Sequence, residues 1–442
     1  MQSLTDPSNP LFNAPFTAIF LALFGIGLTL RFWLATRQIR HVTRHRATPP
    51  TAFADTITPE AHQKAADYTL AKTRLARLQL PVEAALLLTL TLGGGLQFLH
   101  ALTDPLQHVW MQALSLGDLW HGALLLVSLT VASALVDLPF DLWRQFVIDV
   151  RFGFNRQTLR GYLLDVVRQT LVGLAIGLPL ILLILWLMGM AGERWWLWAW
   201  LAWAGFNLTL LSLYPTLIAP LFNRFTPLPD GELKSRIEGL LTRCGFHASG
   251  VFVMDGSRRS SHGNAYFTGF GRSRRVVFYD TLLNQINPAE TEAVLAHELG
   301  HAHHQHIKKR LAMMFALSLG LLYLLAQLKQ MPAFYTGFGV STATDATALA
   351  LFVLLLPVLL FPFSPVFSAG SRRHEFEADR YAARHSSADH LIAALLKLYR
   401  ENASTLTPDP LYALFYDSHP KPTERIGQLQ RLTQRLTQRL TP

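Results

Sequence analysis

Two histidines four residues apart, with a glutamate beside the first, are the strongest chemical signal in this sequence. The run is His297-Glu298-Leu299-Gly300-His301. Residues four apart share one face of a helix, so both imidazoles can reach one ion, and Glu298 can touch a water bound to that ion. The pattern predicts a catalytic site with one Zn²⁺ per chain. The alternative is a helix end with histidines on its solvated face, which three further histidines favour: His303, His304 and His306.

The third ligand must come from another part of the chain. Cys244 is the only cysteine, so a cysteine-based zinc site is excluded. A metzincin would need Gly at position 304 and His at position 307, where this chain has His304 and Ile307. A carboxylate from a later helix is the remaining common solution, and it leaves one coordination position open for catalysis.

The segment Glu375-Phe376-Glu377-Ala378-Asp379 supplies such a carboxylate. Glu375 and Asp379 lie four apart, so one can bind the metal while the other orients a ligand histidine from behind. Taken alone, the segment also fits an ordinary charged helix. Its position just after the last apolar run, on the same predicted membrane face as His297, favours the metal site.

The composition indicates a membrane protein. Of 442 residues, 50% are hydrophobic and 15% are charged, against about 25% charged in ordinary soluble domains. A bilayer core needs about 20 apolar residues of helix. Seven segments qualify: 15–33, 80–102, 119–139, 163–190, 195–215, 311–328 and 348–366.

The distribution of Lys and Arg predicts the topology. These residues gather in the connections at 34–79 and 140–162, whereas 104–118 and 331–345 contain none. Because basic loops stay on the cytoplasmic side, we expect the N-terminus outside and the C-terminus inside. Both polar regions, 223–310 and 371–442, then face the cytoplasm. The net charge of +10 is explained by this bias, so we expect no nucleic-acid partner.

The apolar and polar segments divide the sequence into four predicted regions. Residues 1–222 hold five transmembrane helices with cytoplasmic loops. Residues 223–310 form a zincin-like catalytic region, with strands at 250–254 and 275–279 and a capped helix start at Asn287-Pro288 that carries His297 and runs on towards the sixth span. Residues 311–370 hold helices six and seven. Residues 371–442 form a C-terminal catalytic region that ends in an amphipathic helix at 429–440.

The sequence resembles the integral-membrane zinc metalloproteases of the CAAX prenyl protease type, in peptidase family M48. The resemblance covers nearly the whole chain and is most specific in five runs: PLFNRFTPLP at 220–229, GSRRSSHGNAYFTG at 256–269, HELGH at 297–301, SRRHEFEAD at 371–379 and SHP at 418–420. It departs from the family pattern at Thr268, where an aromatic is common, and at Lys421, where a second proline is usual.

The resemblance implies a mainly α polytopic membrane protein whose seven transmembrane helices enclose a chamber, with a cytoplasmic zincin-like α+β catalytic domain. It implies roles for these residues: zinc bound by His297, His301 and Glu375, with Asp379 supporting a ligand histidine; Glu298 as general base and His419 as donor to the oxyanion; Asn264 on an edge strand that aligns substrate; and Arg425 near the substrate.

The implied function is hydrolysis of peptide bonds near the C-terminus of a protein substrate, prenylated or not, by a monomer surrounded by membrane lipids. One rival is a bacterial quality-control protease of the inner membrane without a lipid requirement, because a bacterium would lack prenylated substrates; a eukaryotic member would sit in the ER membrane. The other rival is a transporter or lipid-binding protein with a structural metal. Glu298 argues against it, since a structural site needs no general base.

Overall fold

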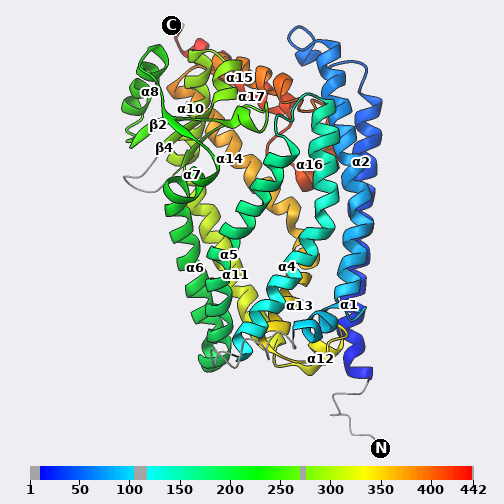
Figure 1. Cartoon of the computed structure of the whole chain (residues 1–442). Helices are drawn as coiled ribbons and strands as arrows, with labels where there is room; N and C mark the ends of the chain where they lie inside the picture. Colours follow the sequence, from blue (N-terminus) through cyan, green and yellow to red (C-terminus); the bar gives the residue numbers. More distant parts are fainter. Residues whose placement is uncertain (1–9, 104–116, 269–274, 441–442) are drawn as a thin grey trace, which may run out of the picture.

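The computed structural model describes residues 10–103, 117–268 and 275–440, most of them helical (Figure 1). Six stretches in these residues are long and apolar enough to cross a membrane. They contain helices α1 (Pro10–Arg44), α4 (Gly117–Trp143) with a π-helical turn at Arg144–Asp149, α5 (Leu159–Met190), α6 (Trp195–Leu213), α7 (Ala219–Phe222), α11 (His306–Leu328), α13 (Asp345–Leu360) and α14 (Ser364–His385).

The predicted second span is not one straight helix. Helix α2 (Pro59–Leu90) and a short helix, Gly95–Thr103, meet at 61°, and if this bent pair is one span, the described residues hold seven candidate crossings. Glycines at 93–95 cause the bend. Gly94 has a φ of +74°, and a Cβ on Gly93 or Gly95 would lie 2.9 or 2.7 Å from the carbonyl oxygen of Thr89. Only glycine tolerates such an approach. Most of the following predicted connection, 104–118, lies outside the described residues.

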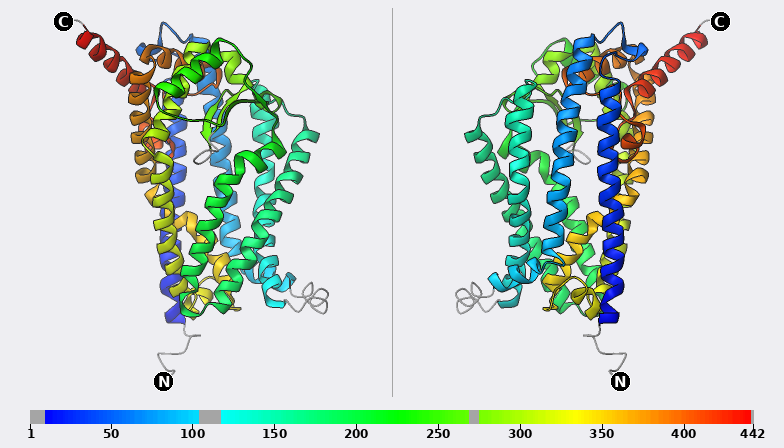
Figure 2. Two further views of the ribbon diagram at one scale, coloured as in Figure 1. Left: turned by 90° about the vertical axis from the view of Figure 1, so that its left-hand side faces the viewer. Right: turned by 90° about the vertical axis from the view of Figure 1, so that its right-hand side faces the viewer.

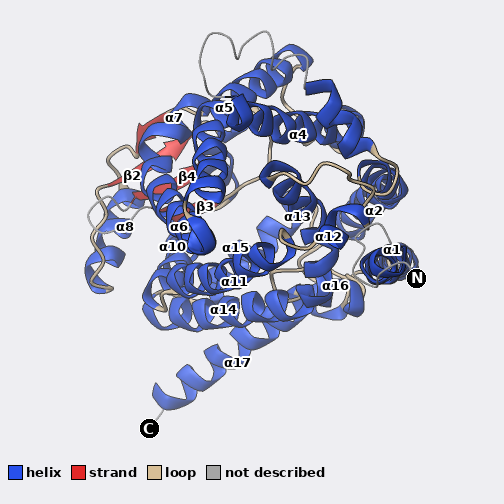
Figure 3. Ribbon diagram, turned by 90° about the horizontal axis from the view of Figure 1, so that it is seen from below, coloured by secondary structure: helices blue, strands red, loops and turns tan. Residues whose placement is uncertain are grey.

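The long helices form a closed ring (Figure 3). Helix α1 contacts α2, and contacts continue in order through α4, α5, α6, α11 and α13, which contacts α1 again. Many large apolar side chains on these helices are exposed, as Leu163, Leu171 and Trp186 on α5 are. Such faces suit lipid.

The polar elements gather at one end of the ring, opposite the start of α1 (Figures 1 and 2). A four-stranded sheet has the order β1-β2-β4-β3, with β1 (Phe225–Pro227), β2 (Gly250–Met254), β3 (Ala265–Thr268) and β4 (Arg275–Tyr279). The predicted strands at 250–254 and 275–279 are confirmed as the parallel central pair. Helices α8 (Glu232–Arg243), α9 (Asp280–Gln285), α10 (Pro288–His303) and α15 (Ala388–Glu401) share a buried core with the sheet.

Both basic connections of the predicted topology lie at this end as well. Phe53, between α1 and α2, packs with Leu406 and Ile426 of the C-terminal region. Asn155, between α4 and α5, forms a β-bridge with Ser260. The structure therefore places the basic connections and the polar regions together. At the other end lie α12 (Pro332–Thr336) and the half-buried ion pair of Lys329 with Asp345.

The prediction that the helix of His297 runs on towards the sixth span is wrong in one respect. Helix α10 ends at His303, and α11 begins at His306. Between them Gln305 has a left-handed backbone, with a φ of 56°, which ends one helix and redirects the next. At the C-terminus, α16 (Pro410–Tyr416) precedes α17 (Pro422–Leu440), which contains the predicted amphipathic tail and projects from the body (Figure 2).

Candidate metal centre

Helix α10 places the two histidines. Its start is fixed by a capping box, in which the Asn287 side chain accepts from the Glu290 amide and the Glu290 side chain accepts from the Asn287 amide. From there α10 is buried almost to its end, and His297 is only 7% exposed. The Nε2 atoms of His297 and His301 lie 3.2 Å apart on one face. The four-residue spacing therefore brings both imidazoles to one point, as the sequence predicts.

Helix α14 brings the carboxylate to the same point, and Gly300 makes the approach possible. A Cβ on Gly300 would lie 2.8 Å from the Cα of Ala378 and 3.0 Å from its carbonyl oxygen. The glycine in the middle of the histidine motif thus lets α10 and α14 touch backbone to backbone. Any larger residue there would push Glu375 away from the imidazoles.

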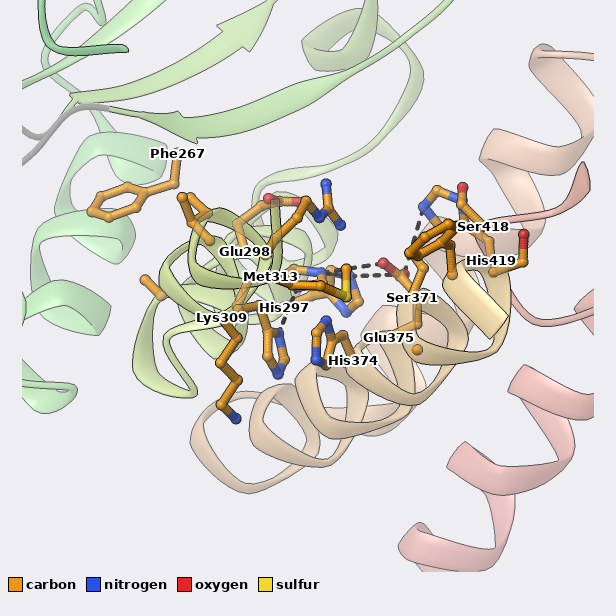
Figure 4. A pocket seen from close by; sticks show the side chains of 18 of the residues that line it. Phe267, His297, Glu298, Lys309, Met313, Ser371, His374, Glu375, Ser418 and His419 are labelled. Carbon is orange, nitrogen blue, oxygen red and sulfur yellow. Dashed lines mark hydrogen bonds and ion pairs between the residues drawn. The ribbon is translucent and has the colours of Figure 1, made fainter. Parts of the chain in front are cut away.

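The carboxylate of Glu375 faces both histidines (Figure 4). Its Oε2 lies 3.4 Å from Nε2 of His297, and its Oε1 lies 3.3 Å from Nε2 of His301. Among the described residues these three are the group whose ligand atoms could hold a metal ion. Oε2 of Glu375 is buried and has no hydrogen-bond partner there. A buried oxygen without a hydrogen bond is costly. Its nearest cationic groups lie at 3.4 Å (Nε2 of His297), 3.6 Å (Nε2 of His419) and 3.7 Å (Nη1 of Arg425), so a metal ion between it and the two imidazoles would lower that cost. The residues fit a zinc ion.

Asp379 and Arg425 form a layer behind the ligands. Asp379, which is fully buried, lies 2.8 Å from Nδ1 of His297 through its Oδ1. The Arg425 guanidinium donates to both oxygens of Asp379 at 2.7 Å, and its Nη2 lies 3.1 Å from Nδ1 of His297. Asp379 occupies the supporting position that the resemblance implies. Arg425 is 5% exposed, and its Nη1 lies 3.7 Å from Oε2 of Glu375. Its contact with substrate stays a prediction.

The open side of the site is a cavity of about 810 Å³ lined by both histidine ligands, Glu375, Glu298 and residues of α11 and α14. Burial raises the pKa of the Glu298 carboxyl, and the nearby imidazoles of His297 and His301 oppose that rise. A carboxyl with a raised pKa is better matched to proton transfer near neutral pH. Glu298 therefore has the position and the environment of a general base.

His419 reaches the cavity from the loop before α17. Its Nε2 lies 3.6 Å from Oε2 of Glu375, and its Nδ1 lies 3.0 Å from the Ser418 hydroxyl. The side chain is 64% exposed, which leaves it open to a substrate. Figure 4 shows it near Glu375 on the rim of the cavity. The short sequence SHP gives no signal of this position without the family resemblance.

Asn264 lies at the start of the edge strand. Strand β3 pairs only with β4 in the described sheet, so its outer edge is open. Asn264 directly precedes β3, and its side-chain oxygen accepts from the amide of Ala265. The β3 residue that lines the cavity is Phe267. The structure confirms that β3 is an edge strand, but it does not bring the Asn264 side chain to the metal ligands.

Two neighbours of the site are not predicted from the sequence, His306 and Glu377. The alternative interpretation, a solvated helix end, would expose His303, His304 and His306, and of these three only His303 is exposed. His306 is 2% exposed, and its Nδ1 lies 2.9 Å from Nδ1 of His301. The turn at Gln305 folds this side chain back against the ligand. Helical periodicity does not predict this position of His306, because the chain turns at Gln305 and is not one continuous helix there.

Known proteins resemble this chain over most of its length. The model of the CAAX prenyl protease N-terminal region, described as five membrane helices, matches residues 38–224, and the model of peptidase family M48 matches residues 227–433. A CAAX prenyl protease 1 homolog of Arabidopsis thaliana is 36% identical over 310 residues, which are 70% of this chain and 73% of that protein. The Homo sapiens homolog is 30% identical over 466 residues, covering 94% and 96%.

A solved structure extends the similarity to three dimensions. The crystal structure of S. mikatae Ste24p matches with a TM-score of 0.86 at 30% identity, and the match covers 94% of this chain and 99% of that chain. It includes the membrane helices and the metal-site helices alike. These comparisons confirm the predicted multi-pass, mainly helical membrane fold with a catalytic region that contains a small sheet.

Proposed function

Since this chain belongs to peptidase family M48, in its CAAX prenyl protease branch, we propose that it is a membrane-embedded zinc endopeptidase with ligands His297, His301 and Glu375, which cuts prenylated CAAX-type proteins near their C-terminus. The family makes the chain a metalloendopeptidase. The identity of the metal, the ligand roles, the lipid on the substrate and the monomeric state are our proposals. The observation that carries the metal and ligand assignments is the Glu375 carboxylate, which faces one imidazole with each oxygen, has no hydrogen bond at Oε2 and lies beside Glu298.

Two side chains, Glu298 and His419, would act on the reacting atoms. A bound zinc ion would act as Lewis acid and lower the pKa of a coordinated water from 15.7 to about 7. Glu298 takes a proton from the attacking water and later delivers it to the leaving amine nitrogen. His419, whose Nε2 side points to Glu375, donates to the oxyanion that develops on the substrate carbonyl; such donors contribute roughly 3–4 kcal/mol in other hydrolases. Phe267 on the open edge of β3 lies where an extended substrate would pair.

Basic residues that line the cavity suit a substrate that ends close to the cleaved bond. Lys309 and Arg310 of α11 line the same cavity as Glu298, and a C-terminal carboxylate would be attracted to them. Both sit near the predicted cytoplasmic end of a span, where basic residues also arise from topology. Cleavage of one peptide as free acid and as C-terminal amide separates the two explanations. We expect a lower KM for the acid, and equal values would remove this support.

The experiment that tests the catalytic assignment is Glu298→Gln. The variant keeps the size and hydrogen bonding of the side chain but loses the base, so we expect peptide cleavage to fall about 10²–10⁴-fold with zinc content unchanged. Lys308→Gln, an exposed neighbour outside the cavity, is the matched control. Full activity in Glu298→Gln would refute the assignment. Comparing a farnesylated with an unlipidated peptide then tests the proposed substrate class.

A further inference from the structure

The two ligand histidines are supported in different ways. Nδ1 of His297 meets the carboxylate of Asp379 directly, at 2.8 Å. Nδ1 of His301 meets another imidazole, that of His306, at 2.9 Å. On its far side His306 places Nε2 3.0 Å from Oε2 of Glu377. A carboxylate thus stands behind each ligand, but behind His301 it is one ring further away.

Backbone geometry puts the intervening ring there. His306 is the first residue of α11, and the left-handed Gln305 before it turns α11 away from α10. The imidazole is held in its plane by His374, whose ring stacks on it at 4.0 Å and 12°. Glu377 in turn accepts from Nε of Arg373 at 3.2 Å. His306 is 2% exposed, and its two ring nitrogens face His301 and Glu377.

Donor and acceptor roles in this chain are determined once His301 binds a metal. Its Nε2 faces Oε1 of Glu375 and Nε2 of His297, so Nε2 is the ligand atom and Nδ1 must carry the proton. The Nδ1 proton is donated to His306, which accepts through an unprotonated Nδ1. His306 then carries its own proton on Nε2 and donates it to Glu377. Every atom of the chain has one role, and none is left without a partner.

We infer that Glu377 and His306 form a positioning relay that holds the ring and the tautomer of His301 for metal binding, as Asp379 does for His297. The inference rests on the proposed metal ligands and adds two residues that are not themselves proposed as ligands. Partners behind a ligand histidine orient its ring and raise its basicity, and their loss typically weakens metal binding about 10–100-fold.

The test uses His306→Leu, His306→Asn and Glu377→Gln in the full-length protein in detergent, with Lys308→Gln as control. Zinc affinity is measured by competition with a chelator, and kcat and KM are measured at saturating zinc. We expect His306→Leu to bind zinc about 10–100-fold more weakly, with KM unchanged. His306→Asn should recover part of this loss because its amide oxygen can accept from Nδ1 of His301. Glu377→Gln should lie between His306→Leu and the wild type.

A merely structural role gives a different pattern. In that case the melting temperature of the metal-free protein falls in all three variants, and Asn does no better than Leu. Zinc affinity within twofold of wild type in His306→Leu would overturn the relay. So would a lower melting temperature in all three variants with Asn no better than Leu. If the wild-type chain itself binds no zinc, or if Glu298→Gln stays active, the proposed function fails instead, so the two failures are distinguishable.

Discussion

Paired charges occur both around the proposed metal site and within the ring of membrane helices. Around the site, Asp379 and Arg425 are 0% and 5% exposed and form a bidentate pair with both bonds at 2.7 Å. In the ring, Arg31 of α1 and Glu83 of α2 pair at 3.3 Å, but each side chain is 37% exposed, on the wall of a cavity of about 330 Å³. One pair is sealed and the other is open.

Helices also pack more closely at the proposed metal site than at several positions in the ring. Helices α10 and α14 meet through Gly300 and Ala378 with almost no space between their backbones. Within the ring, Gly25, Gly173 and Gly177 have nothing within 4 Å of the position of a Cβ. Close packing fixes positions to fractions of an ångström, which three metal ligands require. The ring has only to keep apolar faces towards lipid, so we expect it to tolerate changes that the site does not.

Of the substitutions that test this contrast, Arg425→Met should change melting temperature and zinc affinity the most. It leaves the Asp379 carboxylate buried without its partner, which costs about 3–5 kcal/mol in other proteins. We expect the melting temperature in detergent to fall sharply and zinc affinity to fall about 10–100-fold, because Asp379 then no longer holds His297 in place.

A double variant shows whether the pair acts as a unit. Arg425→Met with Asp379→Leu removes both charges, and exchanging a whole buried pair for apolar residues is often neutral for stability. The melting temperature should recover while zinc affinity stays low. If Arg425→Met alone leaves both quantities unchanged and raises KM instead, Arg425 acts on the substrate, as the family resemblance first implies.

Gly300→Ala should have a smaller effect through packing alone. The added Cβ would sit 2.8 Å from the Ala378 backbone, and overpacking of this kind costs about 1–3 kcal/mol. Because α14 must move, Glu375 moves with it, and each 1.4 kcal/mol that reaches the site costs a factor of ten in zinc affinity. The matched control is Gly239→Ala in α8, where the nearest atom is the flexible end of Arg243 at 3.4 Å. Equal zinc affinity in both variants would contradict this account.

The sequence predicts the parts of the site that depend on local periodicity and on the family pattern. The pairing of His297 with His301, the capped start of α10 and the strands β2 and β4 all follow from residue types at short spacing. Apolar runs likewise predict the spans, because a membrane imposes their length.

What the sequence does not predict depends on backbone turns. The glycines at 93–95 bend the second crossing, and the left-handed Gln305 separates α10 from α11. A hydropathy average over a window of residues predicts neither of these two turns. Because of that second turn His306 is buried against His301 rather than solvated. The orientation of Arg425 towards Asp379 depends on the packing of α17 against α14, which no spacing within either helix reveals.

The smallest effect should come from the ring, and Arg31→Gln tests whether the two regions are separate. A pair this exposed contributes at most about 1 kcal/mol, and Gln can still donate to Glu83. We expect the melting temperature to change slightly, with zinc content and kcat within twofold of wild type, and the same for Glu83→Gln. Charged residues within membrane segments are often functional, so the measurement is worth making. Loss of zinc from Arg31→Gln would mean that the ring transmits its geometry to α10 and α14, and the contrast between a sealed site and a tolerant ring would then be wrong.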